Sequence, residues 1–178
     1  SIYANSKDGG FYRSSKKAAE EYIEEYKNIY NLKFTVLRFG SLYGIRAQKN
    51  NGLNKILLKA INEKKIQYQG TANSIREYIN VEDAARGSVE VLKKKYENKY
   101  VIITGNKKIK LISLLNYIKK SLHIKTKIKF SHNKNSHLGH YTSNPFTYKP
   151  YKGKKLKIKN QKVFFNEIDK YITNREFK

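Results

Sequence analysis

The sequence predicts an α/β fold with a mainly parallel sheet. Strand-like and helix-like segments alternate from the start of the chain to about His132. Such alternation is typical of parallel sheets, because each helix returns the chain to the same edge. Of the 178 residues, 39% are apolar. This is enough for the core of one ordinary domain, so we expect a folded chain.

The first predicted helix covers residues 12–30. Its apolar residues recur every three or four positions with glutamates between them, which predicts one packed stripe and one solvated face. The stripe consists of Ala19, Tyr22, Ile23, Tyr26 and Ile29. Residues 34–38 then predict a buried strand, because a run of apolar and β-branched residues suits a sheet that is covered on both faces.

The same patterns place the remaining elements. After a loop that holds Gly40 and Gly44, residues 53–62 predict a helix. Residues 82–94 predict another, with acids in its first turn and lysines in its last, which suits the helix dipole. Residues 132–162 hold both prolines and three of the four histidines, so we expect a loop-rich segment. The further expected elements are strands at 66–68, 76–81, 100–104 and 125–130, and helices at 111–122 and 163–172.

The net charge of +24 arises from 38 basic and 14 acidic residues. Such a charge can indicate a basic nucleic-acid-binding module. Only six of the basic residues are arginine, whereas recognition of phosphates and base edges favours the planar guanidinium. A lysine excess beside many Asn, Ile and Tyr residues is what a compositional drift would produce. We therefore do not expect a nucleic-acid partner, and residues 149–162 are the best place for an electrostatic function.

The composition also bears on metal sites and location. The chain has no cysteine, which excludes disulfides and cysteine nucleophiles and fits a cytoplasmic protein. No apolar run approaches the roughly 20 residues that span a bilayer, so we expect no membrane association. His132, His137 and His140 lack the spacing of a metal site and are interpreted as loop residues, so no metal is expected.

Tyr12 and Lys16 form a chemically suggestive pair. They are four positions apart, which places both side chains on one face of a helix. A free tyrosine has a pKa near 10, and a neighbouring ammonium lowers it by about 1–3 units. Such a tyrosine can act as a general base near neutrality. With 15 tyrosines in the chain, the spacing alone is not diagnostic.

Four segments surround this pair with ordered motifs. They are SIYA at residues 1–4, YRSSKKAAE at 12–20, LRFGSLYGIR at 37–46 and REYINVEDAA at 76–85. In this order they resemble blocks of the extended short-chain dehydrogenase/reductase family, in its NAD-dependent sugar-nucleotide epimerase/dehydratase branch. The corresponding family patterns are the end of Ser-Ser-x-x-Val-Tyr-Gly, then Tyr-x-x-Ser-Lys-x-x-x-Glu, Leu-Arg-x-x-Asn-x-Tyr-Gly-Pro-Arg and Arg-Asp-Tyr-Ile-His-Val-x-Asp-x-Ala.

The resemblance implies a fold and a catalytic pair. The fold would be the carboxyl-terminal part of a partial Rossmann-like, doubly wound parallel sheet, joined to a small α/β substrate-binding region. Tyr12 would be the acid/base that deprotonates a sugar hydroxyl, and Lys16 would hold the cofactor ribose and lower the pKa of Tyr12. The cofactor would be NAD or NADP, contacted by these two residues and by Phe39 and Ser41.

The resemblance also implies a nucleotide-sugar substrate and its contacts. These would come from Ser41, from Asn51, Gly52 and Leu53, and from Arg76. A guanidinium suits the substrate diphosphate because it binds in a bidentate manner. The alternative for Arg76 is a surface ion pair with the adjacent acids. Asp83 would be structural, and the complete protein would be a homodimer.

The expected division places residues 1–48 in the cofactor domain and residues 49–178 mainly in the substrate-binding region, with returning strands and helices and a basic tail. The chain begins at Ser1, inside a strand-like segment, and has no Gly-rich pyrophosphate-binding turn. The family's catalytic Ser/Thr would fall upstream of Ser1. We therefore expect a fragment that is inactive alone.

The departures from the family pattern leave the reaction open. Ser41 replaces the usual Asn, Ile45 the usual Pro and Glu77 the usual Asp. An epimerase of UDP-sugars is the favoured hypothesis, and a dehydratase or a sugar-nucleotide reductase of the same family is the alternative. A basic nucleic-acid-binding module and an inactive remnant are the alternatives from other classes.

Overall fold

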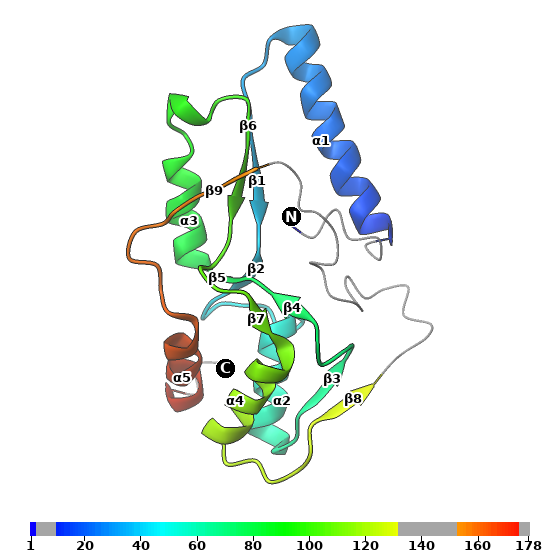
Figure 1. Ribbon diagram of the computed structural model, residues 1–178, viewed down its shortest axis with the longest axis vertical. Coiled ribbons are helices and arrows are strands. Elements are labelled where there is room, and N and C mark those ends of the chain that lie inside the picture. The colour runs from blue at the N-terminus through cyan, green and yellow to red at the C-terminus, as the bar shows by residue number, and fades with distance from the viewer. Residues whose placement is uncertain (3–9, 132–152, 175–178) are drawn as a thin grey trace.

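A three-stranded parallel sheet forms one part of the molecule, and three helices with short strands form the other (Figure 1). The computed structural model describes residues 1–2, 10–131 and 153–174. In the sheet, β1 (Thr35–Phe39) and β9 (Lys154–Lys155) flank β6 (Lys99–Ile103). Both pairings are parallel. The β-branched residues of β1 and β6 favour this extended backbone.

Helices α1 (Gly10–Tyr30) and α3 (Val81–Glu90) cover opposite faces of this sheet (Figure 1). Because side chains alternate between the faces of a strand, the pairing of β1 with β6 gives each face its own set. The face toward α3 is apolar and forms part of one buried cluster. The cluster consists of Ile79, Ala84, Val91, Val101, Ile103 and Leu156. The α1 face instead presents Arg38 and Tyr100. The doubly wound arrangement and the parallel sheet predicted from the sequence are thus confirmed.

The second part has its own core, built by three helices. They are α2 (Gly52–Glu63), α4 (Leu111–Ser121) and α5 (Phe164–Asn174). Each presents an apolar stripe inward, and Leu57, Leu114, Leu115, Ile118 and Ile168 are completely buried. Burial of one such side chain contributes about 1.5–3 kcal/mol.

Three short strand pairs lie outside the three-stranded sheet. The strands are β2 (Ser41–Tyr43) with β5 (Tyr78–Asn80), β3 (Gln67–Gln69) with β8 (Lys129–Ser131), and β4 (Ile75–Arg76) with β7 (Ile109–Lys110). The first two pairs are parallel and the third is antiparallel. Through β2 and β5 the chain passes directly from the sheet to the helical part.

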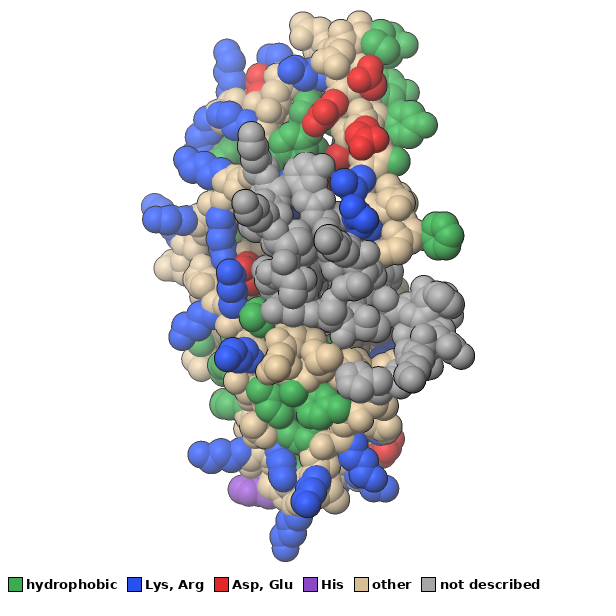
Figure 2. Space-filling view, turned by 45° about the vertical axis from the view of Figure 1, so that its right-hand side comes forward, with side chains coloured by type: hydrophobic (Ala, Val, Ile, Leu, Met, Phe, Trp, Pro, Cys, Tyr) green, Lys and Arg blue, Asp and Glu red, His purple; other side chains and the backbone are tan. Residues whose placement is uncertain are grey.

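The prediction that the first helix packs one apolar stripe is wrong for the described residues. No residue of α1 is buried, and Tyr22 and Ile29 are 69% and 66% exposed. Figure 2 shows hydrophobic side chains along the outer side of this helix. The helix attaches to the sheet through two glutamates instead: Glu20 bonds Arg38 and Glu24 bonds Tyr100.

Several predicted boundaries also differ. The helix expected at 82–94 ends at Glu90, and a 3₁₀ turn, η2 (Lys94–Tyr96), follows. The strand expected at 76–81 is divided into β4 and β5, because Glu77 interrupts it. The strand expected at 125–130 is confined to β8. Finally, β9 lies in a segment predicted to be loop, because its pairing partner β6 is distant in the sequence.

Candidate functional site

The carboxyl ends of the parallel strands form the framework of the candidate site. The backbone N–H of Gly40 donates to the carbonyl of Ile103 at 3.0 Å, and that of Ser41 to the carbonyl of Glu77 at 2.8 Å. A Cβ on Gly40 would overlap the Glu77 carbonyl, so only glycine permits this approach. Ligands of open α/β sheets bind outside the carboxyl ends of the strands.

Helix α1 brings Tyr12 and Lys16 to this same end. It runs opposite to β1, so its first turns lie level with the carboxyl end of that strand (Figure 1). The Lys16 ammonium nitrogen lies 5.7 Å from the centroid of the Tyr12 ring. Tyr12 is half-buried and Lys16 is exposed. The two side chains therefore share one face of the helix, as predicted from their spacing.

Residues 1 and 2 lie beside the carboxyl end of β1, near Lys16. The backbone N–H of Ile2 donates to the carbonyl of Phe39, the last residue of β1, at 3.1 Å. Lys16, Glu20 and Arg38 are the charged side chains that act on Ser1. Lys16 thus lies near the segment that pairs with the end of β1.

A buried ion pair holds α1 on the sheet. Arg38 of β1 donates from Nε and from one terminal nitrogen to the two oxygens of Glu20, at 3.0 and 2.5 Å. Arg38 is 3% exposed, and its guanidinium carbon lies 4.5 Å from the centroid of the Tyr100 ring. The Tyr100 hydroxyl donates to Glu24. Arg38 and Glu20 therefore position the helix that carries Tyr12 and Lys16. Both residues lie within the motifs described above, but the motifs do not indicate that the two side chains meet.

Phe39 and Ser41 occupy the strand end differently. Phe39 points toward the α3 face and packs against the apolar cluster there, whereas Tyr12 and Lys16 come from the opposite side. Ser41 is half-buried at the start of β2, paired with Tyr78. The structure therefore brings Ser41 and the backbone of Phe39 to the end where α1 begins, but directs the Phe39 ring to the core.

The predicted substrate residues of α2 have structural contacts. Asn51 caps the helix: its Oδ1 accepts from the backbone N–H of Leu53 at 3.1 Å and of Asn54 at 3.3 Å. Its Nδ2 donates to the carbonyl of Leu42 at 3.1 Å. Leu53 is 4% exposed in the core, and Gly52 is exposed. Of these three residues, Asn51 lines a half-open hollow of about 340 Å³ beside β2, together with Tyr43 and Arg46.

Arg76 lies in β4 and is 8% exposed. Its side chain is therefore not on the surface of the described structure. One terminal nitrogen of its guanidinium donates to the carbonyl of Ile75 at 2.9 Å. The adjacent Glu77 carboxylate lies 3.2 Å from the Lys155 ammonium, which ties the β4–β5 junction to β9.

A buried polar cluster fixes the hollow beside β2. Asp83 is completely buried, and its carboxylate accepts from Arg86 and from the backbone N–H of Lys162, the latter at 2.8 Å. This confirms the expected structural role of Asp83. Burial, reinforced by the Glu167 carboxylate, raises the pKa of Tyr43 above its ordinary value. Tyr43 thus remains protonated, as a wall of the hollow rather than a base.

Other features bear on metals and membranes. Within residues 1–2, 10–131 and 153–174, no group of three or more His, Asp or Glu side chains could hold a metal ion. The three histidines considered above and Tyr3 lie outside the described residues. The described part of the chain also contains no helix with the length and hydropathy of a membrane span.

Fold and strand-end site together define an α/β protein with a Rossmann-like sheet. The family model of the NAD dependent epimerase/dehydratase family matches residues 4–103. The chain belongs to this family, and the sequence resemblance is thereby confirmed.

Individual relatives agree with this assignment. The UDP-glucuronate 4-epimerase of Thermodesulfobacterium geofontis is 28% identical over 82 residues, which are 46% of this chain and 25% of that protein. The dTDP-glucose 4,6-dehydratase DesIV of Streptomyces venezuelae, solved with NAD, has a TM-score of 0.71 at 14% identity, over 91% of this chain and 49% of that one. The UDP-glucose 4-epimerase of Thermotoga maritima, solved with UDP-glucose, has a TM-score of 0.61 at 22% identity, over 70% and 41%.

At these identities the two solved structures show only that the fold is shared. The chain also spans only 25–36% of the length of the curated relatives that it matches.

Proposed function

We propose that this chain is the carboxyl-terminal part of an NAD(P)-dependent UDP-sugar 4-epimerase, with Tyr12 as its acid/base. The observation that supports this most directly is the Tyr12–Lys16 pair on α1, beside the carboxyl ends of the parallel strands. Family membership and the UDP-sugar 4-epimerase among the relatives support the same reaction class.

In this proposal Tyr12 moves a proton at one sugar hydroxyl. Its phenolate oxygen would accept the hydroxyl proton when the same carbon loses its hydride to the bound cofactor and becomes a ketone. Its hydroxyl would return the proton when the hydride comes back to the other face of that ketone. Lys16 lies on the same face of α1, with its ammonium nitrogen 5.7 Å from the centroid of the Tyr12 ring, and would hold the cofactor ribose. The Arg38–Glu20 pair keeps both side chains in position.

The proposed cofactor is NAD or NADP, which would accept a hydride from the sugar and return it. The residues present suit its nicotinamide–ribose end. Lys16 offers an exposed ammonium, and Ser41 a half-buried hydroxyl where glycine brings the strands close together. Phe39 would contribute through the end of β1.

For the nucleotide sugar we propose Ser41, Asn51, Leu53 and Arg76 as contacts. Asn51 lines the hollow beside β2, and Leu53 would support this wall from the core. Arg76 is the candidate for the diphosphate, since a partly desolvated guanidinium makes strong charge-assisted hydrogen bonds. We further propose residues 1–48 as part of the cofactor domain, 49–178 as mainly substrate-binding, a cytoplasmic location and no nucleic-acid partner.

The central test uses the complete protein with the Tyr12→Phe substitution. We expect loss of UDP-sugar epimerisation by at least about 100-fold, because general acid–base catalysis contributes roughly 10²–10⁴-fold. NAD affinity, measured by calorimetry, should change little. Tyr26→Phe on the same helix is the matched control and should retain activity. Unchanged turnover of the Tyr12→Phe protein would remove this tyrosine from the mechanism.

The products of the same assay distinguish the related reactions. An epimerase yields an isomer of unchanged mass, a dehydratase yields a keto sugar lighter by one water, and a reductase consumes stoichiometric NAD(P)H. Mass spectrometry of the UDP-sugar pool with absorbance of the reduced cofactor separates the three.

A further inference from the structure

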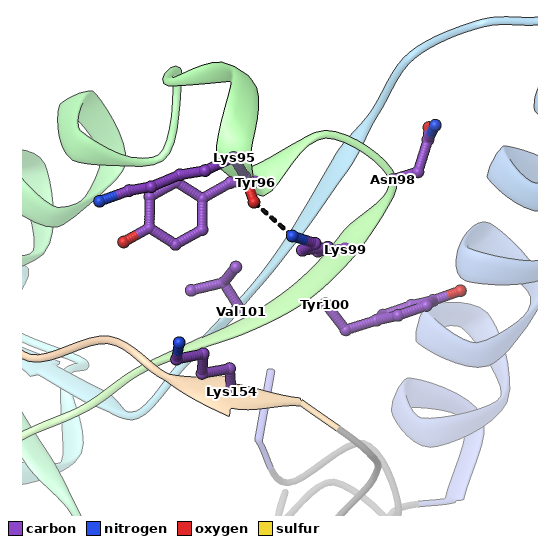
Figure 3. A pocket seen from close by; sticks show the side chains of 7 residues that line it. All are labelled: Lys95, Tyr96, Asn98, Lys99, Tyr100, Val101 and Lys154. Atoms are coloured by element: carbon purple, nitrogen blue, oxygen red, sulfur yellow. Dashed lines mark hydrogen bonds between the residues drawn. The ribbon is translucent and has the colours of Figure 1, made fainter.

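A basic hollow lies at the amino-terminal end of β6, between η2 and β9. Its volume is about 440 Å³. Figure 3 shows the side chains of Lys95, Tyr96 and Lys99 on one side, Lys154 on the other and Val101 between them. The hollow therefore combines three ammonium groups with a partly apolar floor.

The lysines of this hollow are incompletely neutralised. Lys95 pairs with Glu90 at 3.2 Å and lies 4.9 Å from the centroid of the Tyr96 ring. Lys99 donates to the carbonyl of Lys95 at 2.5 Å, which orients its ammonium but supplies no counter-charge. Neither Lys99 nor Lys154 makes an ion pair with any carboxylate in the described ranges. Like charges around a concave surface create a field that favours an anion.

A second hollow of about 250 Å³ continues the first along β9. The two share Lys95, Tyr96 and Lys154, and the second adds Lys155, Lys157 and the Glu90 carboxylate that pairs with Lys95. The basic lining is thus extended rather than a single point. This shape suits a linear anion with several charges better than a lone phosphate.

The position separates the hollow from the proposed active site. Lys99 is the first residue of β6, whereas Ser41 and the first turns of α1 lie at the carboxyl ends of the parallel strands. The length of the sheet lies between the two sites, so an anion in the hollow would not contact Tyr12 or Lys16.

We propose that this hollow binds the phosphate chain of a small oligophosphate anion. Lysine ammonium groups bind phosphate as compact point charges with three donors each. The volume lies within the range of about 300–1,000 Å³ typical of small-ligand sites. The phosphate chain could belong to free oligophosphate or to a nucleoside triphosphate, whose base would stack on Tyr96.

The test must separate this hollow from the general attraction of a chain with charge +24. We would titrate the intact protein with tripolyphosphate by calorimetry at constant ionic strength. The variant Lys99→Gln/Lys154→Gln should lose affinity by about tenfold or more, since each tenfold step is only about 1.4 kcal/mol. The control Lys120→Gln/Lys125→Gln removes the same charge from α4 and the loop after it, and should stay within about twofold. Equal losses in both variants, or none in either, would overturn the proposal.

A second measurement does not depend on variants. Backbone amide shifts of the intact protein during the tripolyphosphate titration should change first at Asn98 and Lys99, and changes spread evenly over the lysines would count against the site.

A titration with ATP identifies the source of the phosphate chain. Binding that is tighter than that of tripolyphosphate, and that loses this advantage in Tyr96→Leu, indicates a nucleotide. Equal affinity indicates free oligophosphate. A single-stranded oligonucleotide bound in preference to both, and weakened equally by both double variants, would also overturn it.

Discussion

Arg38 shows how one residue determines the position of helix α1. Its guanidinium is buried in the sheet, meets both oxygens of Glu20 and stacks on Tyr100. Because α1 has no buried apolar residue in the described structure, this pair replaces the hydrophobic contact that usually fixes a helix.

We expect Arg38→Lys to lower the free energy of unfolding by about 1–3 kcal/mol, because lysine keeps the charge but cannot make the bidentate contact. Urea unfolding measures the change, and amide hydrogen exchange in α1 should accelerate. The control is Glu63→Gln, which removes an exposed pair with Lys59 and should cost no more than about 0.5 kcal/mol. Equal effects of the two substitutions would show that Arg38 is not the attachment of α1.

Tyr43 supplies a pH-dependent prediction. Burial, with the Glu167 carboxylate, raises its pKa in the folded state. The stability from its retained proton is complete below the unfolded pKa of about 10, and is lost as the pH rises toward the folded value. Above about pH 10 the wild-type protein should lose about 1.4 kcal/mol per pH unit more than Tyr43→Phe. Urea midpoints of the two proteins from about pH 9 to about pH 11 test this, and a constant difference would contradict it.

At the scale of the element, the start of α2 depends on one cap. Asn51 bonds two backbone N–H groups of the first turn and also the carbonyl of Leu42 in β2. The cap therefore joins the helix of the second core to the strand that leads from the sheet.

Asn51→Ala should destabilise the protein by about 1–2 kcal/mol, because N-cap replacement costs about 1 kcal/mol and the bond to β2 is lost as well. Thermal unfolding monitored by circular dichroism measures the shift. Asn50→Ala is the neighbouring control, since Asn50 is exposed in a turn. If Asn51→Ala and Asn50→Ala unfold at the same temperature, the cap contributes nothing measurable to stability.

At the scale of the whole molecule, the described structure leaves an apolar stripe of α1 exposed. It includes Phe11, Tyr22, Tyr26, Ile29 and Tyr30, each at least 53% exposed. Contiguous apolar surface of this kind marks an interaction site, and it supports the proposal that the complete protein is a homodimer.

Sedimentation of the complete protein should therefore give twice the chain mass at micromolar concentration. Tyr22→Lys together with Ile29→Lys should shift it toward the single-chain mass without loss of secondary structure. Lys120→Gln, far from the stripe on α4, is the neutral control. A single-chain mass for the unaltered protein over the whole concentration range would contradict the homodimer.

The sequence alone determined the fold class, the family and most elements, because these depend on neighbours along the chain. Three patterns each specify a local conformation. They are the apolar run at 34–38, the four-residue spacing of Tyr12 and Lys16, and the apolar periodicity at 111–122. The tertiary structure decided features that depend on distant residues. Glu20 meets Arg38 only when a helix packs on a strand, and β9 becomes a strand only beside β6. The stripe of α1 stays exposed because the helix attaches to the sheet through Glu20 and Glu24. Such contacts leave no periodic signal, so the positioning of Tyr12 and Lys16 was not predictable from the sequence.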